Sequence, residues 1–136
     1  MSRSPLTRVG LTAAYVGYLA VLAVLTLDPS QQAPGASLSL VSQVLTWLRV
    51  PVPADSRILE VASNVVLFVP LSLIGGLLWP ARRVRDWVLV GALLSTLIEV
   101  CQLLFLPDRF ATVSDVLANT TGALLGALLW RRDRPT

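Results

Sequence analysis

The sequence contains no histidine and no lysine, and it contains one cysteine, Cys101. The chain therefore has no imidazole base, no lysine nucleophile and no histidine ligand for a metal. A single cysteine cannot form a disulfide within the chain, so it does not indicate a redox compartment. Any catalysis would depend on carboxylates, hydroxyl groups or this thiol, and we expect no metal and no cofactor.

Charged residues are also scarce, at 14% of 136 residues, whereas 54% are hydrophobic, and this balance favours lipid as the solvent. Four apolar stretches are each about 18–22 residues long, close to the ~20 that a helix needs to cross hydrocarbon. These stretches are Val9–Leu27, Ile58–Trp79, Trp87–Leu106 and Val113–Trp130. The sequence predicts an all-α integral membrane protein with four transmembrane helices, in one domain covering residues 1–136.

The first stretch follows Arg3 and Arg8, as the apolar part of a signal peptide would. It is long for that role, and no small-residue cleavage site follows Leu27. Asp28 and Pro29 are instead typical of the end of a helix. We therefore expect a retained membrane helix.

Arginine is the only basic residue, and its distribution predicts the topology. Eight arginines precede the first stretch, separate the second from the third, or follow the fourth: Arg3, Arg8, Arg82, Arg83, Arg85, Arg131, Arg132 and Arg134. Three fall in the alternate segments: Arg49, Arg57 and Arg109. This bias predicts a multi-pass protein of the cell membrane with both termini in the cytoplasm. Because the arginines cluster at helix ends rather than along a stripe, nucleic-acid binding is not expected.

The long segment Asp28–Arg57 would lie outside the cell. Apolar residues recur in it at helical spacing, with Trp47 nearby: Leu38, Val41, Leu45 and Leu48. This pattern is typical of a short amphipathic helix on the outer membrane surface, and it is equally consistent with a partly ordered loop.

Polar pairs lie toward the predicted outer end of three stretches: Glu60 and Asn64, Glu99 and Gln102, Asp115 and Asn119. Members of a pair are three or four residues apart, so each pair occupies one helix face. A charged carboxylate in hydrocarbon costs about 2.5–3.5 kcal/mol, which makes such a group a candidate for function. Arg109 lies in the loop above this layer, where it could bind an anionic headgroup or a carboxylate or be an ordinary loop arginine. The sequence predicts an outward-facing polar pocket in which these seven residues bind a ligand.

Structural roles are the alternative for several of these residues. Asn64, Gln102 and Asn119 could form hydrogen bonds between helices, worth about 0.6 kcal/mol each. Asp115 could be a first-turn charge that the helix dipole favours. Glu99 is the deepest carboxylate, and hydrogen bonding between helices does not require a charge, so a functional role is favoured for it.

Other features concern packing. Small residues form a stripe along the fourth stretch: Ser114, Ala118, Gly122 and Gly126. A GxxxG pattern allows another helix to approach closely, within the chain or in a homo-oligomer. The short connections at 80–86 and 107–112 predict that the second and third helices, and the third and fourth, are antiparallel neighbours. Trp79, Trp87 and Trp130 lie at the predicted cytoplasmic boundary.

Four segments of the chain resemble VanZ-like membrane proteins. Ser63–Leu71 resembles their Asn-x-x-Leu-Phe-x-Pro stretch, and Leu97–Leu104 resembles their Ile-Glu-x-x-Gln segment. Asp108–Phe110 and Ser114–Gly126 resemble their arginine loop and their Asp-x-x-x-Asn-x-x-Gly-x-x-x-Gly helix. The matches occur in order over about Glu60–Leu129, and the one departure is Ser72, where a glycine is frequent.

The resemblance implies a role at the bacterial cell envelope, linked to low-level resistance to the glycopeptide teicoplanin. Two functions follow as hypotheses. In the first, the pocket binds a lipid-linked envelope precursor or another lipophilic envelope component. In the second, the protein is an intramembrane enzyme that modifies a lipid-linked substrate, with Glu99 as acid or base and Asp115 as its ionised partner.

Overall fold

The computed structural model describes residues 4–27, 32–47, 49–52, 55–106 and 112–132. In these residues the chain forms five helices and no strand: α1 (Pro5–Leu27), α2 (Gln32–Trp47), α3 (Ser56–Leu78), α4 (Val84–Phe105) and α5 (Val113–Arg132). Four of them, all except α2, are long and apolar enough to cross a membrane. The predicted all-α class and the four predicted spans are confirmed, and the helix ends differ from the expected ones by a few residues.

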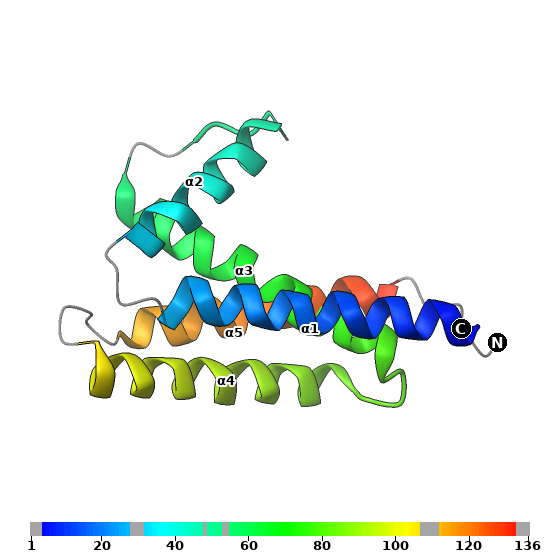
Figure 1. Ribbon diagram of the computed structural model, residues 1–136. Helices are drawn as coiled ribbons and strands as arrows, with labels where there is room; N and C mark the ends of the chain where they lie inside the picture. Colours follow the sequence, from blue (N-terminus) through cyan, green and yellow to red (C-terminus); the bar gives the residue numbers. More distant parts are fainter. Residues whose placement is uncertain (1–3, 28–31, 48, 53–54, 107–111, 133–136) are drawn as a thin grey trace.

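The four long helices alternate in direction (Figure 1). The start of α1, the end of α5 and the connection between α3 and α4 lie at one end of the bundle. We call this the arginine end after the described arginines that it carries: Arg8, Arg82, Arg83, Arg85, Arg131 and Arg132. The starts of α3 and α5 and the end of α4 lie at the opposite end, which we call the polar end because it carries the three predicted polar pairs.

Helix starts at both ends are held by side chains that accept hydrogen bonds from backbone amides. The Asp55 carboxylate accepts from the Arg57 amide at 2.9 Å, and the Thr112 hydroxyl accepts from the Asp115 amide at 3.1 Å. At α4, the Asp86 carboxylate accepts from the Arg83 amide at 2.8 Å. These bonds satisfy first-turn donors that have no partner within their own helix.

The closest packing in the bundle joins α3 and α5. Gly122 and Gly126 face the backbone of α3 so closely that an added Cβ atom would overlap the carbonyl oxygens of Val65 and Val69. The buried Ser72 hydroxyl of α3 donates to the Ala123 carbonyl of α5. The predicted small-residue stripe thus allows close helix approach within the chain. A homo-oligomer through the same glycines stays a prediction.

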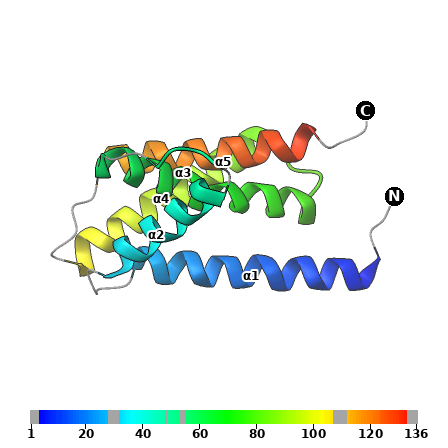
Figure 2. The ribbon, with the colours of Figure 1, turned by 90° about the horizontal axis from the view of Figure 1, so that it is seen from above.

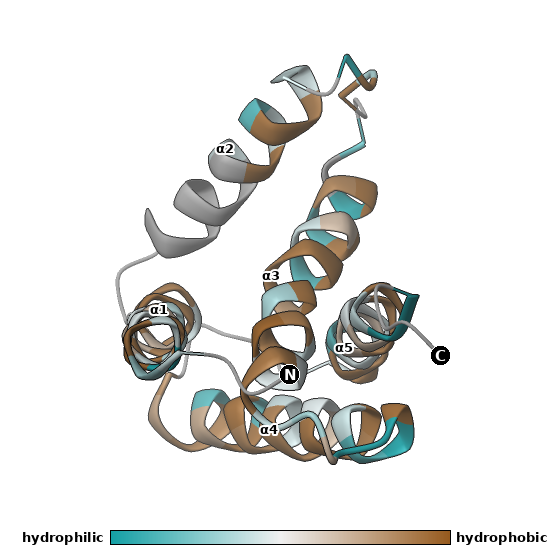
Figure 3. Ribbon diagram, turned by 90° about the vertical axis from the view of Figure 1, so that its right-hand side faces the viewer, coloured by the Kyte–Doolittle hydropathy of each residue, from teal (hydrophilic) through white to brown (hydrophobic). Residues whose placement is uncertain are grey.

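Helix α4 packs mainly on α5, where Gly91 faces the side chain of Ala123. The short connection between α3 and α4 predicted that these two helices would be antiparallel neighbours, and their directions are opposite. They do touch, but each makes far more contact with α5 than with the other. Figure 3, seen nearly along α1 and α5, shows α3 and α4 inclined to that direction. A short loop joins the ends of two helices, but side-chain size decides where they pack along their length.

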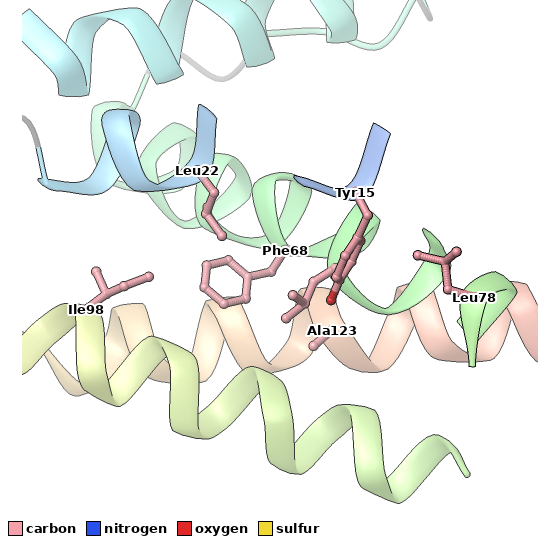
Figure 4. Packing of buried hydrophobic residues seen from close by; sticks show 7 residues of the cluster. Tyr15, Leu22, Phe68, Leu78, Ile98 and Ala123 are labelled. Carbon is pink, nitrogen blue, oxygen red and sulfur yellow. The ribbon is translucent and has the colours of Figure 1, made fainter. Parts of the chain in front are cut away.

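Helix α1 is more loosely held. Its buried side chains are Tyr15 and Leu22, which pack into a cluster with Phe68, Ile98 and Ala123 (Figure 4). Most of its other side chains are exposed in the isolated chain, as lipid-facing residues of a membrane helix would be.

Helix α2 lies beside α1 and the first part of α3, outside the bundle of long helices (Figures 1 and 2). Val41 is buried, whereas the Trp47 side chain is 82% exposed. A helix was one of the two structures that the sequence left open for this segment. Its amphipathic placement on the membrane surface stays a prediction.

Candidate functional site

The three polar pairs lie at the polar end but differ in burial. Glu99, Gln102 and Asn119 are buried, Asn64 and Asp115 are half-buried, and Glu60 is exposed. Arg109, the seventh predicted residue, lies outside the described residues. In the described part of the chain, Glu60 has no hydrogen bond or ion pair, so the structure does not join it to the other five.

Asn64 and Asp115 connect α3 to α5. The Asn64 Nδ2 atom donates to Asp115 Oδ1 at 2.7 Å. A hydrogen bond to a carboxylate is stronger than one between neutral groups. The residues come together because the glycine contacts, about two and three turns further along α5, bring the two helices close.

Glu99 joins the end of α4 to the start of α5. The residue is 7% exposed, and its Oε2 atom accepts a hydrogen bond from the Thr112 amide at 2.8 Å. Thr112 immediately precedes α5, where free amides and the helix dipole both favour an anion. This buried carboxylate therefore fixes the first turn of α5.

Asn119 and Ser95 form a second connection between α5 and α4. The Asn119 Nδ2 atom donates to the Ser95 hydroxyl at 2.8 Å, and both residues are buried. The Asn119 Oδ1 atom is buried without a hydrogen-bond partner among the described residues. An unsatisfied buried acceptor costs about 1–3 kcal/mol, so a donor group placed beside it would be stabilised.

Gln102 connects α4 to α1. Its Nε2 atom donates to the backbone carbonyl of Thr26 at 2.8 Å, near the end of α1. All three predicted carboxamides therefore donate to another helix, which confirms their interpretation as hydrogen bonds between helices. Ligand binding by the same residues stays a prediction.

Sequence reasoning missed three partners in this layer: Thr26, Ser95 and Thr112. Two of them could have been recognised from their spacing in the sequence. Ser95 is four residues before Glu99 and so shares its helix face. Thr112 precedes Asp115 by three residues, the spacing of a capping box. Thr26 contributes a backbone carbonyl, which no side-chain pattern predicts.

Hydrogen-bonding groups make up most of this layer. Within the described ranges, no group of three Cys, Asp or Glu side chains could hold a metal ion. The chemistry that these residues offer is hydrogen bonding and charge: two carboxylates, three carboxamides and two hydroxyl groups, whose hydrogen bonds link α1, α3, α4 and α5.

Fold and site together define a small multi-pass membrane protein whose long helices are cross-linked by polar side chains at one end. A family model described as VanZ/LLP1 matches residues 15–132. The chain belongs to this family, and the resemblance that the motifs indicated is confirmed. No curated protein and no solved structure matches the chain.

Proposed function

We propose that this protein binds a lipid-linked or lipophilic component of the bacterial cell envelope at its polar end. The observation that supports this is the gathering of carboxylates and carboxamides from α3, α4 and α5 at one depth of the bundle. Packing alone does not require two carboxylates there, because each charge has a desolvation cost that a neutral amide avoids.

The proposal includes the topology. With the arginine end in the cytoplasm, the polar end lies in the outer leaflet, where lipid-linked envelope precursors are displayed. The ligand would contact the layer through Glu60, Asn64, Glu99, Gln102, Arg109, Asp115 and Asn119. Arg109 suits a phosphate, and the carboxamides suit polar groups of the ligand.

A link to teicoplanin is part of the same proposal. A protein that holds an envelope precursor would change the amount of precursor that the lipophilic drug can reach. The measurement is teicoplanin susceptibility of isogenic strains with and without the gene. Equal susceptibility would remove this part of the proposal and leave binding itself to be tested separately.

The alternative is an intramembrane enzyme. The observation that favours it is the burial of Glu99, because an acid–base carboxylate commonly sits in a water-poor site. Glu99 would exchange a proton with the lipid-linked substrate, and Asp115 would remain ionised. The hydrogen bond from the Thr112 amide to Glu99 does not itself favour catalysis, because it also fits a carboxylate that only holds the start of α5.

The two functions can be separated by mass spectrometry of lipid-linked precursors, measured both in whole membranes and bound to the purified protein. Glu99→Gln keeps a side-chain oxygen that can accept from the Thr112 amide but cannot act as an acid or base. Thr96→Ala is the matched control, because Thr96 is exposed and bonds to its own helix through the Ala92 carbonyl.

Binding predicts that a precursor copurifies with the wild type and the control, and in part with Glu99→Gln, while the precursor masses in the membrane are unchanged. Catalysis predicts a new precursor mass with the wild type that disappears with Glu99→Gln. A protein that retains no precursor and changes no mass would contradict both functions.

A further inference from the structure

The arginine end contains a cavity that the proposed function does not use. Its volume is about 310 Å³, and it lies between α1, the residues that follow α3 and the first turns of α4. Its lining residues are Tyr15, Trp79, Arg82, Asp86, Trp87 and Val90. Since the polar layer is at the opposite end of the bundle, this is a separate candidate site.

Three aromatic rings from different parts of the chain wall the cavity. The Tyr15 and Trp79 ring centroids are 5.5 Å apart with the ring planes at 70°, and those of Trp79 and Trp87 are 6.2 Å apart at 44°. Rings set at such angles around one space resemble the aromatic cages that bind ammonium groups. Trp79 is 46% exposed, so the cage is open on one side.

One residue of each charge completes the lining. The half-buried Asp86 carboxylate accepts from the Arg83 amide through Oδ2, and its Oδ1 atom is 3.7 Å from Arg85 Nε. The exposed Arg82 side chain has no hydrogen bond and no ion pair with any described residue. The cavity therefore offers a carboxylate for a cation and an uncommitted guanidinium for an anion.

Trp87 provides a further observation. The residue is 5% exposed and lines the cavity, yet its indole N–H has no hydrogen-bond acceptor among the described residues. A buried donor without an acceptor is destabilising, so this wall of the cavity is not stabilised by a hydrogen bond of its own to any described residue.

We propose that this cavity binds the headgroup of a phospholipid that carries both a phosphate and a primary ammonium group. Arg82 binds the phosphate, while the rings of Tyr15, Trp79 and Trp87 together with Asp86 hold the ammonium. The acyl chains lie along the exposed apolar side chains of α1 and α4. Pockets for small ligands begin at about 300 Å³, so the cavity fits a headgroup but not a whole lipid.

The test is native mass spectrometry of the full-length protein released from lipid vesicles. The vesicles contain equal amounts of phosphatidylethanolamine and phosphatidylglycerol, which share the phosphate but differ in the ammonium group. We expect retention of phosphatidylethanolamine to exceed that of phosphatidylglycerol about fivefold, the effect of one cation–π contact.

Two variants separate the two parts of the headgroup. Arg82→Gln should lose both lipids, whereas Trp79→Leu should retain both about equally, because it removes one face of the cage. Arg131→Gln is the matched control, an exposed arginine of the same end that does not line the cavity. It should behave as the wild type.

Three results would overturn the proposal. The first is equal retention of the two lipids by the wild type. The second is an equal loss of lipid retention in Arg82→Gln and Arg131→Gln. The third is binding of soluble glycerophosphoethanolamine by a protein that retains neither lipid. Circular dichroism of each variant checks that its helices are intact. None of these results depends on the polar end, so this proposal and the proposed function can fail separately.

Discussion

Helices α5 and α1 are of similar length, yet the bundle holds them in different ways. On α5, two glycines allow its backbone to approach the backbone of α3, and Ser72 adds a hydrogen bond between the two helices. On α1, two buried side chains and two hydrogen bonds, from Tyr18 and from Gln102, make the main contacts. The comparison shows that apolar side chains alone do not pack a helix tightly into a membrane bundle. Lipid solvates apolar side chains as well as the protein interior does, so tight packing needs small residues or hydrogen bonds.

The largest expected effect comes from removing the close approach on α5. Gly126→Leu places a side chain against the Val69 carbonyl and the Ser72 hydroxyl, and a backbone atom cannot yield as a side chain can. We expect a loss of about 3 kcal/mol in the free energy of unfolding, the upper part of the range for overpacking. SDS titration in mixed micelles measures it.

Gly17→Leu on α1 is the control for this experiment, because nothing lies within 4 Å of a Cβ atom added at Gly17. It should leave the free energy of unfolding almost unchanged. If the two variants unfold at the same SDS fraction, the contrast between the two helices is wrong.

The next effect concerns the start of α5. Glu99→Leu removes the acceptor of the Thr112 amide and should cost about 2 kcal/mol, the penalty of an unsatisfied buried donor. Glu99→Gln retains an acceptor oxygen and should cost less than half as much. The same SDS titration compares them, and equal losses would show that the charge of Glu99, rather than its hydrogen bond, stabilises this end.

A smaller effect is expected for the bond between Asn64 and Asp115. A double-mutant cycle with Asn64→Ala and Asp115→Ala should give a coupling energy of about 1 kcal/mol, within the range for hydrogen bonds between membrane helices. A cycle of Asn64→Ala with Thr96→Ala should give none, since Thr96 bonds within α4. Absence of coupling in the first cycle would mean that the 2.7 Å contact does not hold α3 and α5 together.

Much of the fold was predictable from the sequence. Hydropathy predicted the four long helices, because a membrane-crossing helix needs about 20 apolar residues wherever it packs. The alternation of the helices then placed Asn64, Glu99 and Asp115 at one end. The Gly122 and Gly126 spacing indicated a close contact, and the structure identifies α3 as its partner.

The pairing of helices was less predictable. A short connection limits the distance between helix ends, but the contact along the helices depends on which faces carry small residues. For this reason the sequence did not predict that α5 would be the main partner of both α3 and α4. The arginine-end cavity was missed for the same reason, since Tyr15 and Trp87 come to line one cavity through packing between distant segments.

The smallest expected effect tests how α1 is held. The Tyr18 hydroxyl donates to the Leu67 carbonyl of α3 at 2.7 Å, and Tyr18→Phe removes this bond while keeping the ring. Its loss should cost about 0.6 kcal/mol, the average for such bonds between membrane helices, because the Leu67 carbonyl keeps its place in α3. The expected order in the SDS titration is therefore Gly126→Leu, Glu99→Leu, then Tyr18→Phe. A larger loss for Tyr18→Phe than for Glu99→Leu would mean that α1 is essential to the stability of the bundle. The two helices would then differ in how closely they pack but not in how much they contribute to the free energy of unfolding.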